Sequence, residues 1–300
     1  GSATYFREYL RDYMRKWVKT HLKPDGTEYD LYRDGLKIYT TIDSKMQQYA
    51  EEAVTEHLKN LQKEFFIAAK DKENAPFVDI TPEQTKQIML QAKKNSERWR
   101  KMDLNGKSEE EILKSFDVPA KMKIFTYEGE KDTIMKPTDS IIYYKHMLQT
   151  GMMAMEPRSG HIKAWVGGVN YKYFQYDHVG QGARQVGSTF KPFLYATAIE
   201  QLGMSPCDSI IDSYFTMPKG KWGIDKDWSP KNSDGNYRGT TTLQKALANS
   251  INTVSAKLID RVGPKAVVDM AKELGVTSDI PEQPSIALGA VDITVEQMVG

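Results

Sequence analysis

The sequence carries both helical and strand-like patterns, and the fold class that it predicts is α+β. Apolar residues recur at helical spacing over residues 4–22 and again over several segments beyond residue 243. Residues 151–168 instead carry two short apolar runs on either side of a Pro-Gly turn at 157–160, which is typical of two consecutive strands. The chain therefore combines both kinds of element.

The composition is that of an ordinary globular protein, and it excludes some functions. A length of 300 residues suggests about two domains, and 40% of the residues are hydrophobic. The net charge of +1 gives no strong attraction to nucleic acid or to an anionic membrane. No apolar run approaches the roughly 20 residues of a membrane helix. The single Cys207 excludes an intrachain disulfide, and the five histidines lack the spacing of a metal site, so no metal is expected.

The N-terminal part predicts a helix, a strand and a second helix. Residues 1–3 are interpreted as a tag remnant and are left out of the fold. Residues 4–22 form an amphipathic helix that the Pro-Gly turn at 22–26 ends. Alternating residues over 35–43 predict a strand, and Asp43 or Ser44 is expected to cap the following helix.

Residues 60–145 are charged and are predicted to be largely helical. Two helix starts, Thr81–Gln84 and Ser108–Glu111, fit the capping box, in which a Ser or Thr precedes a Glu or Gln by three residues. We interpret this stretch as a solvated helical insertion. A surface that docks a partner is the alternative interpretation.

The stretch "RQVGSTFKPFLYATAIEQLG", residues 184–203, predicts a buried helix that starts with a serine and a lysine. Ser188 and Lys191 are three residues apart and would share one helix face. Pro192 is tolerated in a first turn, and the free N–H groups there could stabilise an oxyanion. A partly desolvated lysine can lose its proton near neutral pH and act as a base toward the serine. A helix cap followed by a solvent-exposed lysine is the alternative for this motif alone.

A second motif supports the functional interpretation of Ser188 and Lys191. After a loop-rich segment at 205–241, short helices are predicted at 243–249, 252–262 and 264–275, and Ser250 and Asn252 lie at the junction of the first two. The order Ser-x-x-Lys and then Ser-x-Asn is the pairing of penicillin-binding proteins and serine β-lactamases.

With these motifs and their surroundings, the chain resembles the transpeptidase part of class A penicillin-binding proteins, the bifunctional peptidoglycan synthases. The resemblance rests on four stretches, "LYRDGLKIYTTIDSKMQQYAEEAV", "MAMEPRSGHIKAWVGG", "RQVGSTFKPFLY" and "WSPKNSDGNYRGTTTLQKALANSINT". It implies a penicillin-binding/serine β-lactamase-like transpeptidase fold, with an antiparallel sheet covered by helices and an all-helical lobe. It also implies that residues 4–35 are a linker after a missing glycosyltransferase domain and that 36–300 are a transpeptidase domain carrying the 60–145 insertion.

The resemblance implies a role for each motif residue. Ser188 would attack a D-Ala-D-Ala stem peptide, Lys191 would take its proton, Ser250 would relay a proton to the leaving D-alanine, and Asn252 would bind the substrate. An amine acceptor would complete the cross-link, and β-lactam antibiotics would acylate the same serine, with no cofactor. The full-length protein would be membrane-anchored at the extracytoplasmic face of the bacterial inner membrane, in the periplasm.

One family motif does not appear, and other functions stay open. No Lys-Thr/Ser-Gly follows Ser250, so the transpeptidase domain is expected to be C-terminally incomplete at Gly300. A serine β-lactamase or a DD-carboxypeptidase is an alternative, as is a non-catalytic β-lactam sensor or cell-wall scaffold. The region between the two motifs shows no obvious second carboxylate for a β-lactamase. Its aspartates are interpreted as loop turn residues: Asp208, Asp212, Asp225 and Asp227.

Overall fold

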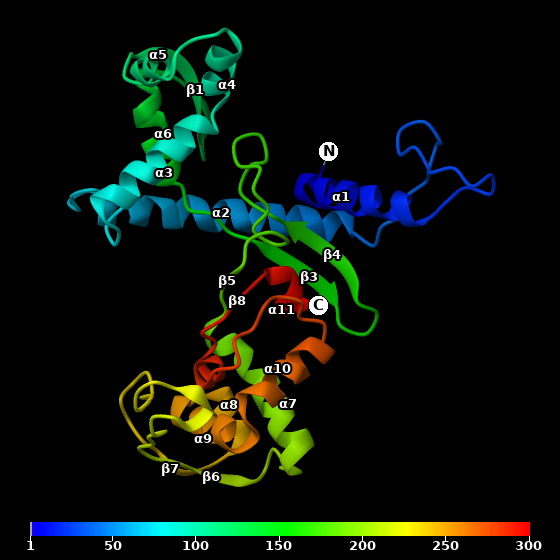
Figure 1. The fold of residues 1–300 in the computed structure, drawn as a ribbon, viewed down its shortest axis with the longest axis vertical. Helices are drawn as coiled ribbons and strands as arrows, with labels where there is room; N and C mark the ends of the chain where they lie inside the picture. Colours follow the sequence, from blue (N-terminus) through cyan, green and yellow to red (C-terminus); the bar gives the residue numbers. More distant parts are fainter. Residues whose placement is uncertain (1) are drawn as a thin grey trace. The chain divides into compact units, whose positions relative to one another are not determined.

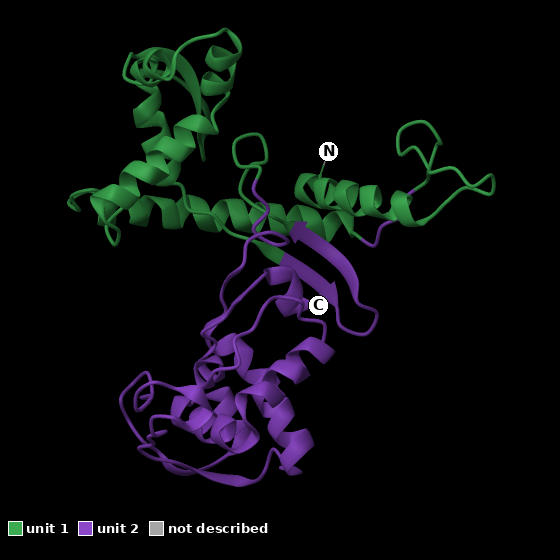
Figure 2. Ribbon diagram, viewed as in Figure 1, with its two compact units in different colours: residues 1–37, 42–152, 166–175 green, residues 38–41, 153–165, 176–300 purple. Residues whose placement is uncertain are grey.

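The computed structural model describes residues 2–300, which form two compact units (Figure 2). Unit 1 contains the described residues up to Lys37 together with Ile42–Met152 and Val166–Gln175. Unit 2 contains Ile38–Thr41, Met153–Trp165 and Tyr176–Gly300, and therefore both sequence motifs. Gly1 of the expected tag remnant lies outside the described residues.

Unit 1 is mainly helical (Figure 1). The two helices predicted before residue 60 are confirmed, and Asp43 caps the second by accepting hydrogen bonds from the N–H groups of Lys45 and Met46. None of the helices in residues 2–300 has the length and apolar character needed to cross a membrane. The helices of unit 1 are α1 (Thr4–Thr20), α2 (Ser44–Ala69), α3 (Pro82–Lys94), α4 (Glu97–Leu104), α5 (Glu109–Ser115) and α6 (Pro137–Lys145).

Both predicted capping boxes are confirmed, at α3 and at α5. We expect Ser108→Ala to lower the free energy of unfolding by about 1 kcal/mol, because the N–H of Glu111 in the first turn of α5 loses its acceptor. Urea denaturation followed by circular dichroism measures this change. Ser44→Ala is the matched control, since Ser44 also begins a helix but its side chain forms no hydrogen bond with another described residue. An equal loss in both variants would contradict the capping role.

The expectation that residues 60–145 are largely helical misses a hairpin. Strands β1 (Ala120–Thr126) and β2 (Gly129–Met135) pair antiparallel in the register Ala120↔Met135 to Thr126↔Gly129. Met122 and Ile124 alternate with lysines in β1, so the two-residue period of a strand was present in the sequence.

The predicted strand at 35–43 is wrong. The structure assigns no strand to these residues, and Ile38 and Tyr39 are 47% and 89% exposed. A strand needs a neighbouring backbone with which its own N–H and C=O groups form hydrogen bonds. Here the bond to a neighbouring strand comes from a side chain instead: Thr41 Oγ1 donates to the carbonyl of Ile162 at 2.8 Å. Alternation in the sequence could not supply that partner.

Unit 2 contains most of the predicted hairpin, which is confirmed as β3 (Met152–Glu156) and β4 (His161–Val166). Two further pairs are antiparallel, β5 with β8 and β6 with β7. The three short helices beyond residue 242 are also confirmed. The remaining elements are β5 (Arg184–Gln185), η1 (Gly187–Phe190), α7 (Lys191–Leu202), β6 (Ser209–Asp212), η2 (Lys221–Gly223), β7 (Gly239–Thr242), α8 (Leu243–Ala248), α9 (Asn252–Val262), α10 (Pro264–Glu273), η3 (Pro284–Leu288), β8 (Asp292–Ile293) and α11 (Val295–Val299).

The core of unit 2 is a helical lobe in which α7 packs against α9, α10 and η3. Phe190, Leu194 and Ala198 present one apolar face that is fully buried. On the opposing elements, Leu258 and Ile286 are fully buried as well. This packing holds α7 in place, and α7 begins at Lys191, the last residue of the Ser-x-x-Lys motif.

Candidate active site

Ser188 lies in η1, a turn of 3-10 helix that runs directly into α7 at Lys191. The sequence predicted the first turn of an α-helix here. Pro192 has no N–H group and cannot donate to the carbonyl of Ser188, so the α-helical bond at this position cannot form. The N–H of Lys191 donates to that carbonyl instead, which is the 3-10 pattern. The side chain of Ser188 is exposed.

The backbone before Ser188 is tied to a segment from much later in the chain. The N–H groups of Val186 and Gly187 donate to the carbonyls of Val291 and Gly289 at 3.0 and 3.1 Å, next to the β5–β8 pair. Gly289 has a φ of 75°, and a Cβ added there would lie 1.7 Å from the carbonyl oxygen of Gly187. Only glycine permits this close approach, which holds the chain one residue before Ser188.

Lys191 is fully buried, and its ammonium has three protein acceptors. Nζ donates to the carbonyl of Ser250 at 2.7 Å, to Ser250 Oγ at 3.0 Å and to Asn252 Oδ1 at 2.8 Å. Burial lowers the pKa of Lys191 to about 8, because the charged form loses its hydration. The amine can therefore lose its proton close to neutral pH.

Ser250 adopts an unusual backbone at the junction between α8 and α9. Its φ is 52°, in the left-handed region that residues other than glycine seldom occupy. Such a conformation costs about 1–3 kcal/mol and persists only where the surroundings enforce it. Here it accompanies two bonds from Lys191 to the same residue, one to the carbonyl and one to the hydroxyl.

The structure brings three of the four predicted site residues into direct contact: Lys191, Ser250 and Asn252. Ser188 precedes Lys191 by one helical turn, and none of the hydrogen bonds among the described residues joins its side chain to the other three. The catalytic roles of these residues stay predictions.

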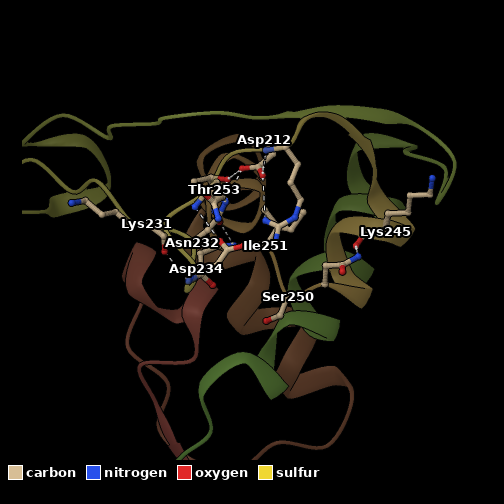
Figure 3. Close-up of polar contacts among 12 residues, drawn as sticks. Asp212, Lys231, Asn232, Asp234, Lys245, Ser250, Ile251 and Thr253 are labelled. Carbon is tan, nitrogen blue, oxygen red and sulfur yellow. Dashed lines mark hydrogen bonds and ion pairs between the residues drawn. The ribbon is translucent and has the colours of Figure 1, made fainter.

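Sequence reasoning missed a buried polar group beside the second motif (Figure 3). Asp212 is only 1% exposed and accepts hydrogen bonds from Asn232 and Thr253, so its interpretation as a loop turn residue was wrong. In the sequence, Asn232 stands out only as part of the stretch at 228–253 that resembles the family. A polar side chain buried within a loop leaves no periodic signal, so the dense run of Asn, Asp and Gly around 232–236 was the only hint.

Comparison with known proteins identifies two family segments. Residues 72–148 match the penicillin-binding protein middle domain, and residues 150–287 match the penicillin-binding protein transpeptidase domain. The second segment includes Ser188, Lys191, Ser250 and Asn252.

Individual relatives agree with the family segments. Penicillin-binding protein 1A of Aquifex aeolicus is 30% identical over 89% of the chain, and that of Rickettsia bellii is 26% identical over 99%. The chain spans only 36% and 38% of these two relatives, about a third of their length.

A solved structure shows the fold. Penicillin-binding protein 1A from Haemophilus influenzae, 19% identical, superposes with a TM-score of 0.60 over 98% of the chain and 44% of its own. The predicted α+β transpeptidase fold is thereby confirmed. The chain belongs to the penicillin-binding proteins and carries the transpeptidase domain of that family.

Proposed function

We propose that this domain is a peptidoglycan DD-transpeptidase that cross-links stem peptides through an acyl-enzyme on Ser188. The observation that carries the proposal is the state of Lys191. Its amine is buried, has a pKa lowered to about 8, and bonds to Ser250 Oγ and Asn252 Oδ1. A lysine tuned in this way is suited to general-base chemistry at neutral pH.

In the first half of the reaction, Ser188 Oγ attacks the carbonyl carbon between the two D-alanines of a donor stem peptide. Lys191 accepts the hydroxyl proton as the new C–O bond forms. The C–N bond then breaks, and Ser250, which accepts a hydrogen bond from Lys191, relays a proton to the departing amine of D-alanine. The product is an ester of Ser188.

In the second half, the amine of an acceptor stem peptide attacks the ester carbonyl. The new amide C–N bond replaces the C–O bond, and Ser188 recovers a proton. Asn252 takes part by binding the amide of the substrate while it holds Lys191. A β-lactam acylates Ser188 in the first half of the reaction. The resulting ester is stable, because no acceptor amine displaces it.

The proposal extends to the whole protein. Residues 4–35 connect to a preceding glycosyltransferase domain, and residues 36–300 belong to the transpeptidase domain, with the charged segment at about 60–145, which also contains the β1–β2 hairpin, inserted in it. The protein is anchored at the extracytoplasmic face of the bacterial inner membrane. Support comes from relatives named penicillin-binding protein 1A, which are more than twice as long as this chain.

The test is the intact mass after incubation with a penicillin, followed by peptide mapping. We expect one stable adduct on the peptide containing Ser188 and no adduct on folded Ser188→Ala. A folded wild-type protein that gains no adduct contradicts the proposal. An adduct that clears rapidly with release of hydrolysed drug would instead identify a serine β-lactamase.

A second assay separates the transferase from a hydrolase or a sensor. The protein is incubated with a stem pentapeptide ending in D-Ala-D-Ala and with an amine acceptor. Release of D-alanine together with an amide-linked product supports the transpeptidase. D-alanine release with hydrolysis alone identifies a carboxypeptidase, and a penicillin adduct without any peptide turnover identifies a sensor.

A further inference from the structure

A chain of buried hydrogen bonds leads from Asp212 toward the start of α9 (Figure 3). One carboxylate oxygen of Asp212 accepts a hydrogen bond from Asn232 Nδ2 at 2.9 Å and another from Thr253 Oγ1. The other oxygen accepts from the N–H of Arg238 at 2.8 Å. Asp212 ends β6, whereas Asn232 lies in the long connection between β6 and β7, so the bond ties this connection back to the end of the strand.

Asn232 caps α9 from outside the helix. Its Oδ1 accepts hydrogen bonds from the N–H groups of Asn252 and Thr253 at 3.0 and 3.2 Å. The first N–H groups of a helix lack intrahelical partners, and a polar side chain just before the helix normally satisfies them. Here the preceding residue is Ile251, which offers no side-chain cap. Asn232 therefore supplies the acceptor that the helix itself lacks.

The same loop fixes the side chain of Asn252. Asn252 Nδ2 donates to the carbonyl of Lys231 at 2.9 Å, which leaves Oδ1 to accept from Lys191 Nζ at 2.8 Å. An amide has one donating and one accepting end, so a carbonyl partner on one side determines which end faces the ammonium. Residues 231–232 thus hold both the backbone and the side chain of Asn252.

Asp212 determines the orientation of Asn232 in the same way. Burial alone would raise the pKa of Asp212, but the hydrogen bonds from Thr253, Asn232 and the Arg238 N–H outweigh it, and the pKa is lowered. An ionised carboxylate can only accept, so it draws Nδ2 of Asn232 toward itself and turns Oδ1 toward α9.

We infer that Asn232 and Asp212 are positioning residues that hold Asn252 Oδ1 against Lys191 Nζ. The inference rests on the proposed function, since its kinetic consequence is the rate at which Ser188 is acylated. The hydrogen bonds of Lys191 go to Ser250 and Asn252 and not to these two residues, so each acts through the start of α9.

The kinetic test is Asn232→Ala, measured with a fluorescent penicillin. We expect the second-order rate constant of acylation to fall roughly 100-fold, as for a misplacement near 1 Å, while the final stoichiometry of labelling stays at the wild-type value. Asn236→Ala is the matched control, because Asn236 lies in the same loop and its side chain forms no hydrogen bond within residues 2–300. A folded Asn232→Ala protein that is acylated at the wild-type rate would overturn the inference.

Asp212→Asn provides a second variant of nearly identical shape, in case Asn232→Ala does not fold. The new side chain can donate as well as accept, so it no longer dictates the orientation of Asn232, and a slower rate is expected again. Combining Asp212→Asn with Asn232→Asp restores an acceptor-only group facing α9. This double variant should recover part of the rate; recovery stays partial because the carbonyl of Asn236 loses its donor. A double variant slower than both single variants would count against the inference.

A measurement that needs no β-lactam separates this inference from the proposed function. Acetic anhydride labels free amines, and the labelling of Lys191 is followed by peptide mapping. We expect faster labelling in Asn232→Ala than in wild type, because Asn252 no longer covers the amine, and no change in Asn236→Ala. Unchanged labelling in folded Asn232→Ala overturns the inference even if the wild type is acylated by penicillin. A wild-type protein that penicillin does not acylate overturns the proposed function. The labelling of Lys191 by acetic anhydride still decides whether Asn232 positions Asn252.

Discussion

Replacing Lys191 with arginine is expected to slow acylation of Ser188 by a penicillin about 10²–10⁴-fold, the usual contribution of a general base. Arginine keeps the positive charge and several N–H donors but cannot lose its proton in a protein. The variant therefore removes the base while retaining donors for Ser250 and Asn252. Stopped-flow fluorescence with a labelled penicillin gives the rate constant.

The pH profile shows whether the base is Lys191 itself. Only the neutral amine can accept the proton of Ser188, and with a pKa of about 8 roughly a tenth of the molecules carry it at pH 7. The rate should therefore rise about tenfold toward pH 9 and then level off, and Lys191→Arg should lack this rise.

The matched control is Lys245→Arg, at an exposed lysine on α8. We expect it to keep the wild-type rate and the same rise with pH. A Lys191→Arg protein with the wild-type rate and the same profile would exclude Lys191 as the base.

Replacing Gly289 with alanine should disable the site without touching any residue of the two motifs. The added Cβ would lie 1.7 Å from the carbonyl oxygen of Gly187, far inside any permitted contact, and the obstacle is backbone rather than a flexible side chain. The chain at Gly187 must move, and Ser188 moves with it. We expect at least a roughly 100-fold slower acylation and a loss of about 1–3 kcal/mol in unfolding free energy.

Gly203→Ala separates the clash from the backbone conformation. Gly203 and Gly289 both end helices in the left-handed conformation, with φ of 59° and 75°, but a Cβ at Gly203 meets nothing within 4 Å. Gly203→Ala should lose some stability and keep the acylation rate. If both alanine variants acylate at the same rate, the close approach of Gly289 to Gly187 does not position Ser188.

The sequence predicted the elements whose signals are local. Pro264, for example, marks the start of α10 and Gly263 the end of α9, because proline suits a first helical turn and glycine suits the position after a last one. The capping boxes at α3 and α5 are complete within four residues. The two short motifs identified Lys191, Ser250 and Asn252 as candidate site residues, and the structure brings these three into contact.

Features that depend on distant partners could not be predicted in this way. Residues 35–43 alternate like a strand but find no partner strand. Asp212 and Asn232 gain their importance from burial against α9, and neither the loop composition nor any period in the sequence encodes that contact. The 3-10 turn at Ser188 could have been predicted from the sequence, because Pro192 lacks the N–H group that an α-helix would need there.

The hydrogen bonds between residues 186–187 and residues 289–291 also determine when, during biosynthesis, Ser188 can reach its native position. A chain leaves the ribosome from its N-terminus, so Ser188 and Lys191 emerge long before Gly289 and Val291. Until those later residues appear, the N–H groups of Val186 and Gly187 lack their native acceptors. The serine is therefore accessible early on the nascent chain but oriented only late. Truncated translation products that stop before residue 289 should escape penicillin labelling, although they contain both motifs.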